Sequence, residues 1–179
     1  MSERWFRHAD PRYPFASELA SQPPARWHGP GEGPVQYLAD TPAGAWAEYL
    51  RHEAITDADD LDDVRRALWV LDVDDGERGG AAAPSLSEEV LTGGIASWIA
   101  CQEEARRLRS GGARALRAPS AALLPGGAAA RVTRGGLRPG RPKDGWVLAL
   151  FGPRPDLEGR KIVDGGRLDA DLLRWTRPL

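Results

Sequence analysis

The amino-acid sequence predicts an α+β fold. Segments typical of β-strands occur towards both ends of the chain, and two segments typical of helices lie between them. The two kinds do not alternate regularly, which disfavours a doubly wound parallel sheet, where a helix follows each strand. The length of 179 residues fits one domain, spanning residues 1–179, with room for a hydrophobic core.

The first predicted helix has a recognisable start. The dipeptide Thr-Pro at 41–42 supplies an N-cap and a proline at the first helical position, so a helix is expected over residues 42–54. Helical periodicity places Trp46, Tyr49 and Leu50 on one face of it.

The second helix is expected over residues 95–110, because Gly111-Gly112 is typical of a helix end. Ser85 or Ser87 is expected to cap a short helical turn just before it. Apolar runs bounded by Gly and Pro predict the strands. These are residues 4–9, 35–39, 64–74, 130–134, 146–151 and 160–169, and a further strand opens the segment 114–124.

Composition excludes several classes of protein. A net charge of -2 gives no electrostatic reason to expect nucleic-acid binding. The longest apolar runs, such as residues 146–151, are far shorter than the ~20 residues of a membrane helix, and the first residues lack the apolar stretch of a signal peptide. A single cysteine fits a reducing compartment. We therefore expect a cytoplasmic protein.

The segment around Arg26 and Trp27 raises the first functional hypothesis. A guanidinium is suited to a carboxylate or a pyrophosphate, and Gly29, Gly31 and Gly33 would let the backbone approach a ligand. The alternative is a surface arginine beside a core tryptophan. Tyr37, on the following strand, is either a core aromatic or a ring that stacks on a flat heterocycle.

Glu48 and Ser120 complete the candidate residues. Glu48 falls on the polar face of the helix, where it faces either bulk water, with His52 as a partner, or a cleft. Ser120 follows Pro119 in a predicted loop, and the surrounding sequence lacks the G-x-S-x-G pattern of a hydrolase nucleophile.

The sequence gives little support for a metal site. His8, His28 and His52 are far apart, and no short-spaced His/Cys pair occurs. The acidic run at residues 57–63 lacks the glycine and the final glutamate of a calcium loop. We expect no metal and no bound cofactor.

The order of these residues resembles the RES domain, a family named for its Arg, Glu and Ser. The resemblance covers about Arg4 to Leu150, and residues 151–179 are interpreted as a C-terminal strand extension. The chain departs from the family pattern at His28, where a small polar residue is common. The matching positions are Arg26, Trp27, the Gly/Pro turn, Val35, Gln36, Tyr37, Ala45, Glu48 and residues 118–121.

The resemblance implies an ADP-ribosyltransferase-like fold, a mixed β core with a few flanking helices. It also implies a toxin that consumes NAD+ as its substrate and is held silent by an antitoxin with a helix-turn-helix segment. A homo-oligomer remains open. By the resemblance, Arg26 holds the phosphates, Tyr37 and Trp27 bind the substrate, Glu48 lies at the reacting ribose, and Ser120 completes the catalytic site.

The implied reaction breaks the bond between nicotinamide and ribose, with water or phosphate as the acceptor. A carboxylate against the developing ribose cation would stabilise the transition state, as in glycoside hydrolysis. Two alternatives stay open. One is an ADP-ribosyltransferase that modifies a macromolecule, and the other is a catalytically inactive RES-like binding module.

Overall fold

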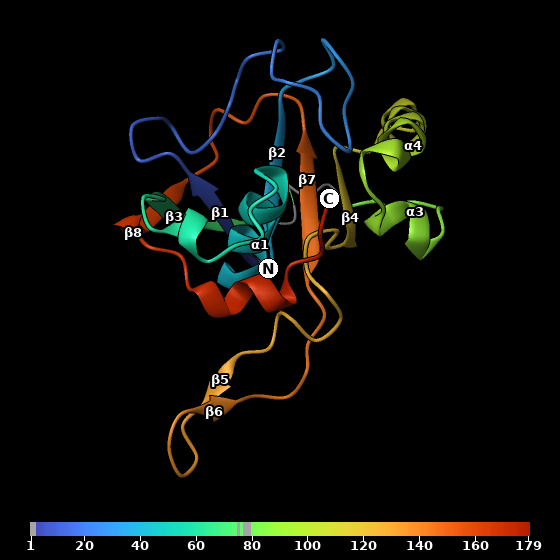
Figure 1. Cartoon of the computed structure of the whole chain (residues 1–179). Helices are drawn as coiled ribbons and strands as arrows, with labels where there is room; N and C mark the ends of the chain where they lie inside the picture. Colours follow the sequence, from blue (N-terminus) through green and yellow to red (C-terminus); the bar gives the residue numbers. More distant parts are fainter. Residues whose placement is uncertain (1–2, 75, 77–79) are drawn as a thin grey trace.

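The computed structural model describes residues 3–74, 76 and 80–179, and its centre is an antiparallel sheet (Figure 1). The strand order is β4-β7-β2-β1-β3-β8. An isolated bridge between Ala82 and Leu116 adds a parallel contact at the β4 edge. The predicted α+β class is confirmed. The strands are β1 (Glu3–Ala9), β2 (Val35–Ala39), β3 (Arg66–Val73), β4 (Ala115–Pro119), β7 (Trp146–Phe151) and β8 (Gly159–Gly166).

Helices flank this sheet at two places (Figure 1). The segment expected as one helix over residues 95–110 begins as a 3-10 turn and continues as α4, and Ser87 caps the short α3, where it accepts a hydrogen bond from Val90 N at 3.4 Å. A 3-10 helix near the C-terminus, η3, was not predicted. The helices are α1 (Pro42–His52), α3 (Glu88–Thr92), α4 (Trp98–Ser110), η1 (Asp59–Leu61), η2 (Ile95–Ser97) and η3 (Ala170–Trp175).

The sheet has a weak junction between β1 and β2. These two strands pair through Phe6 and Ala39, whereas β1 pairs with β3 at seven positions and β2 with β7 at five. The sheet therefore consists of two well-paired halves, β4-β7-β2 and β1-β3-β8, joined over a short distance. Side chains of β1 and β2 next to this junction are free to line a cavity rather than a continuous sheet.

Helix α1 lies across the junction (Figure 1), where it contacts β1, β2 and η3. Its N-cap is Thr41, whose Oγ1 accepts a hydrogen bond from Gly44 N at 3.1 Å, as predicted from the Thr-Pro pair. The fully buried apolar side chains are Ala47 and Leu50, while Trp46 and Tyr49 are half-buried. The helix is thus covered on more than one face, unlike the single apolar face expected from periodicity.

The core lies on both faces of the central strands. On β7, Leu148 and Leu150 pack with Trp5 of β1, while Ala149 and Phe151 pack on the opposite face under α3 and α4. Residues that alternate along a strand point to opposite faces, so a strand buried on both sides is a continuous apolar run. This explains why residues 146–151 were predicted as a strand with the correct ends.

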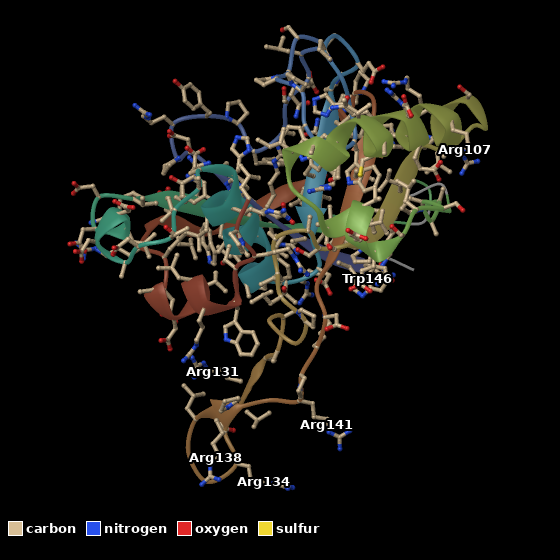
Figure 2. The ribbon with its side chains drawn as sticks, turned by 45° about the vertical axis from the view of Figure 1, so that its right-hand side comes forward. Arg107, Arg131, Arg134, Arg138, Arg141 and Trp146 are labelled. Atoms are coloured by element: carbon tan, nitrogen blue, oxygen red, sulfur yellow. The ribbon has the colours of Figure 1, made fainter. Side chains whose placement is uncertain are left out.

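A hairpin projects from this body. The strand expected over residues 130–134 is only β5 (Arg131–Val132), paired with β6 (Arg138–Pro139). Figure 2 shows Arg134, Arg138 and Arg141 on the projecting part of the hairpin, while Arg131 lies beside η3, with its Nη2 3.9 Å from Asp171 Oδ2. The strand is short because the glycines at 135–136 turn the chain back at once. Among the described residues, no helix is both long and apolar enough to span a membrane.

Candidate active site

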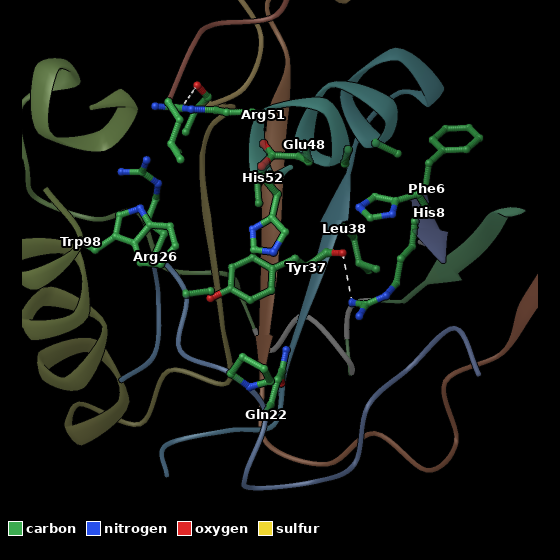
Figure 3. A pocket seen from close by; sticks show the side chains of 18 of the residues that line it. Phe6, His8, Gln22, Arg26, Tyr37, Leu38, Glu48, Arg51, His52 and Trp98 are labelled. Atoms are coloured by element: carbon green, nitrogen blue, oxygen red, sulfur yellow. Dashed lines mark hydrogen bonds between the residues drawn. The ribbon is translucent and has the colours of Figure 1, made fainter. Parts of the chain in front are cut away.

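A cavity of about 320 Å³ opens at the junction of β1 and β2 (Figure 3). This volume lies at the lower end of the range typical of small-molecule sites, about 300–1,000 Å³. Helix α1 forms one wall and the segment before β2 another. The polar side chains that line it are Arg7 and His8 of β1, Gln22, Arg26, Tyr37 of β2, and Glu48, Arg51 and His52 of α1.

Glu48 and Ser120, 72 residues apart in sequence, are in direct contact. Ser120 Oγ donates a hydrogen bond to Glu48 Oε1 at 3.1 Å and accepts bonds from Ala122 N and Leu123 N, each at 3.2 Å. Ser120 is itself buried and lies behind the carboxylate rather than at the cavity surface. The serine therefore positions the carboxylate, which itself lines the cavity.

The backbone around Ser120 is fixed by close packing. Ser120 N donates to Gly145 O at 2.8 Å, and a Cβ at Gly145 would lie only 2.8 Å from Leu123 Cδ1. A side chain at position 145 would therefore require Leu123 to move, so glycine favours this approach between the start of β7 and the turn after β4.

Burial raises the pKa of Glu48 above its ordinary value, while the Ser120 hydrogen bond and the nearby guanidiniums of Arg51 and Arg26 act in the opposite direction. Helical periodicity placed this residue on the polar face of α1, and in the structure it lines the cavity. A carboxylate with a raised pKa in a cleft is typical of a functional site.

The Ser120→Ala variant is expected to raise the pKa of Glu48 further, because the variant loses a hydrogen bond that favours the ionised form. A carbon-detected NMR titration of the Glu48 carboxyl would measure this change. Ser110→Ala, at the exposed end of α4, is the control and should leave the titration unchanged. A lower pKa in Ser120→Ala would contradict the assignment of Ser120 as the donor.

Two arginines meet at one backbone carbonyl. Arg26 and Arg51 both donate to Gly93 O, Arg51 at 2.7 Å. Arg26 also donates to Ser97 Oγ at 2.9 Å, and Arg51 to Ala121 O. The two guanidiniums thereby connect the loop after α3 to the cavity and lie close enough to Glu48 to favour its ionised form.

Tyr37 presents its ring, rather than its hydroxyl, to the cavity. The hydroxyl accepts from Trp27 N at 3.0 Å and lies 2.9 Å from His28 Nδ1, while His28 Nε2 lies 2.9 Å from Pro23 O. A carbonyl can only accept, so Nε2 carries the proton and Nδ1 accepts from the tyrosine. Burial lowers the pKa of His28, consistent with this neutral form. His28, the departure from the family pattern, therefore orients Tyr37.

Trp27 requires a correction. It was predicted to bind the substrate, but its side chain is 2 % exposed and packs in the core with Val35, Leu116 and Phe151. It does not line the cavity. The two sequence interpretations of the Arg26-Trp27 pair thus both apply in part, since the arginine lines the cavity and the tryptophan fills the core.

The sequence did not indicate a role for several residues that line the cavity, among them Arg7, Arg51, His52 and Trp98. One signal for Arg7 was present. Trp5 and Ala9 are buried, and residues two apart on a strand share a face, so Arg7 belongs to a row of inward-facing positions. Arg51 and His52 lie in the same turn of α1 as Glu48, but nothing in their spacing distinguishes them from surface residues.

The cavity carries positive charge although the whole chain is negative. The guanidiniums of Arg7, Arg26 and Arg51 outnumber the one side-chain carboxylate, that of Glu48, among the residues that line it. Burial lowers the pKa of Arg51 to about 10 and that of His8 to about 3, so at neutral pH the arginine is charged and the histidine is not. The site therefore suits an anionic ligand with a locally cationic group near Glu48. Within residues 3–74, 76 and 80–179, no group of three or more His, Cys, Asp or Glu is placed to hold a metal ion.

Comparison with known proteins shows the fold and the family of the chain. No curated protein matches the chain. The fold is similar to that in the crystal structure of the M. tuberculosis MbcT-MbcA toxin-antitoxin complex, with a TM-score of 0.59 and 18 % identity over 97 % of this chain and 88 % of that chain. The family model of the RES domain matches residues 3–171, and the chain belongs to the RES domain family.

Proposed function

We propose that this protein cleaves the bond between nicotinamide and ribose in NAD+, as a glycohydrolase or a phosphorylase. The observation that carries the proposal is the Glu48 carboxylate, held by Ser120 in a cavity that also presents the Tyr37 ring and three guanidiniums. The substrate has the same pattern of charge, an anionic diphosphate and a cationic nicotinamide ribose. Membership of the RES family, which resembles NAD-consuming toxins, supports the proposal.

Each step of the reaction has a group to perform it. As the glycosidic bond breaks, its electron pair passes to the nicotinamide nitrogen, which becomes neutral, and positive charge develops on the ribose. Glu48 stabilises that charge, and electrostatic groups of this kind contribute about 3–4 kcal/mol. A water or phosphate oxygen then bonds to the ribose carbon. With water as the acceptor, the released proton passes to Glu48, whose raised pKa makes it a better base than an ordinary glutamate.

The structural similarity to a toxin-antitoxin complex supports a biological role as the toxin of such a pair. The partner in this proposal is an antitoxin with a helix-turn-helix segment, which silences the enzyme. Inhibition at the cavity predicts that bound antitoxin would slow amide exchange in α1 and in the segment around Arg26.

Incubation of the purified protein with NAD+, with and without phosphate, tests the reaction directly. Release of nicotinamide, followed by chromatography, supports the proposal, and identification of ADP-ribose or its 1''-phosphate defines the acceptor. Release that requires an added protein or nucleic acid, which then carries the label, would replace the proposal with ADP-ribosyl transfer to a macromolecule. No release under any condition would contradict it.

Two replacements of Tyr37 distinguish the contribution of its ring to substrate binding from the contribution of its hydroxyl to stability. Tyr37→Phe keeps the ring and is expected to keep turnover within about threefold per folded molecule, with lower stability because Trp27 N and His28 Nδ1 lose their partner. Tyr37→Ala is expected to raise KM by about tenfold or more, since stacking of a base on an aromatic ring is worth about 1–3 kcal/mol. Steady-state kinetics measure both. Equal KM values in the two variants would exclude a stacking role.

A further inference from the structure

The charge of Arg7 has no counter-ion among residues 3–74, 76 and 80–179. Its side chain lines the cavity, and its Nη1 donates to Tyr37 O at 3.3 Å, the bond drawn to the right of Tyr37 in Figure 3. Among the described residues, it forms no ion pair. A guanidinium carries five N–H donors in a planar fork, so most of the hydrogen-bonding capacity of Arg7 is unused.

This arrangement is unusual for an arginine in such a position. Arg7 lies on the row of β1 that includes Trp5 and Ala9, which are 1 % and 8 % exposed. Burial lowers the pKa of Arg7 to about 10, so the group remains charged at neutral pH while it is partly removed from water. A desolvated charge without a partner is destabilising, and an anionic ligand would remove that penalty.

The other arginines of the cavity are committed to the protein. Arg26 donates to Gly93 O and Ser97 Oγ, and Arg51 to Ala121 O and Gly93 O. Nearby, Arg66 donates to His8 Nδ1 at 3.1 Å and stacks on the Tyr49 ring. Arg7 therefore differs from its neighbours, because most of its N–H donors remain available to a ligand in the cavity.

Position also distinguishes Arg7 from the catalytic carboxylate. Figure 3 shows Arg26 and Trp98 on one side of the Tyr37 ring and His8 of β1 on the other. Glu48 is held at the end shared with Ser120, Arg26 and Arg51. A doubly negative diphosphate is repelled by Glu48 and attracted to a cation at the β1 end, where no carboxylate lines the cavity.

We propose that Arg7 is the phosphate-binding residue of this cavity and holds the diphosphate of the dinucleotide in a bidentate manner. The inference rests on the proposed function for the identity of the dinucleotide. It assigns to β1 the contact that the sequence assigned to Arg26, and it leaves Arg26 to position the loop around Gly93. The adenosine half of the substrate then extends beyond β1, and its nicotinamide half lies at Glu48.

Direct binding measurements test this role without requiring turnover. Isothermal titration with ADP and with ADP-ribose is performed on the wild type, Arg7→Gln, Arg7→Lys and the control Arg4→Gln. Arg4 is on the same strand but exposed, with its charge near Asp72. We expect Arg7→Gln to weaken both ligands by about 10- to 100-fold, Arg7→Lys to recover part of the loss, and Arg4→Gln to bind as the wild type does.

A second readout separates binding from a general structural effect. Because the diphosphate does not change charge during the reaction, loss of Arg7 should raise KM for NAD+ and leave kcat within about threefold. Nicotinamide, which lacks phosphate, should inhibit the wild type and Arg7→Gln equally. If Arg7→Gln does not fold, the affinities of Arg7→Lys and Arg4→Gln for ADP are compared instead. Weaker binding by Arg7→Lys than by Arg4→Gln would support the role, since lysine keeps the positive charge but not the planar set of N–H donors.

The outcomes distinguish this inference from the proposed function. Nicotinamide release by the wild type, together with unchanged ADP-ribose affinity and KM in Arg7→Gln, would overturn the inference and leave the function in place. ADP binding that depends on Arg7, without any nicotinamide release, would support the phosphate site and refute NAD+ cleavage. Absence of ADP binding in the wild type, or equal losses in Arg7→Gln and Arg4→Gln, would refute the phosphate site.

Discussion

Glu48→Gln is expected to lower the rate of nicotinamide release by about 10²- to 10³-fold, the largest effect of any single replacement. The amide keeps the shape of the side chain but cannot stabilise a ribose cation by its charge. The measurement is the turnover rate at saturating NAD+, so that a change in binding does not contribute. Glu53→Gln, one residue beyond the end of α1, is the matched control and should retain full activity.

Although Glu48→Gln should lower activity, it is expected to increase the stability of the folded protein at neutral pH. Since burial raises the pKa of Glu48 in the folded state, the folded protein binds this proton more tightly than the unfolded chain does. The free energy of unfolding therefore falls as pH rises from the ordinary glutamate pKa, about 4.3, through the raised value. Glutamine resembles the protonated form, so Glu48→Gln should be more stable than the wild type at pH 7.5.

Thermal denaturation at pH 7.5 and pH 4 measures this difference. The stability advantage of Glu48→Gln should narrow at the lower pH, where most of the wild-type carboxyl is protonated in both states. A variant that is less stable than the wild type at pH 7.5 would mean that the guanidiniums outweigh burial, and the direction inferred for the Glu48 pKa would be wrong.

Arg26→Ala is expected to reduce both stability and activity. Arg26 is 9 % exposed, and its loss leaves Gly93 O and Ser97 Oγ without one of their donors. Buried acceptors that lose a hydrogen-bond donor destabilise the folded protein, here by about 2–4 kcal/mol in total. For a chain of this size, that corresponds to a decrease in Tm of about 10 °C. Activity should fall because the loop around Gly93 and the Arg51 guanidinium lose their position.

Arg26→Lys distinguishes the charge of Arg26 from its hydrogen bonds. The lysine keeps a cation near Glu48 but cannot bond several acceptors in one plane, so stability should remain low while activity partly returns. Arg167→Ala, at an exposed position, is the control and should change the free energy of unfolding by less than about 0.5 kcal/mol. Equal stability of Arg26→Ala and Arg167→Ala would contradict the structural role of Arg26.

Local patterns were sufficient to predict most of the sheet. The ends of β2 and β7 agree with the sequence, because Gly and Pro bound both apolar runs. The hairpin at β5 and the C-terminal η3 were not predicted correctly, since their form depends on a turn at the glycines and on contacts with α1. Such contacts join residues far apart in sequence, which a local pattern does not record.

The candidate site could also be predicted only in part, because its walls come from segments far apart in sequence. Periodicity identified Glu48 as a polar position but could not distinguish bulk water from a cavity, because the opposite wall comes from other segments. The positions of Trp27 and Arg7 were missed for a similar reason. Trp27 is adjacent to Arg26 in sequence, yet the sheet directs it into the core, whereas Arg7 reaches the cavity only because β1 and β2 separate.

The short pairing of β1 with β2 has a mechanical consequence. Within the described part of the chain, Phe6 and Ala39 are the one pair that joins the two halves of the sheet in register, so relative motion of the halves is opposed there by few main-chain hydrogen bonds. A dinucleotide that contacts Arg7 on one half and Tyr37 on the other acts as a cross-link between them. Occupancy should therefore stiffen the whole domain, and an inhibitor that spans the gap should protect β3 and β7 from deuterium uptake although it touches neither strand's centre.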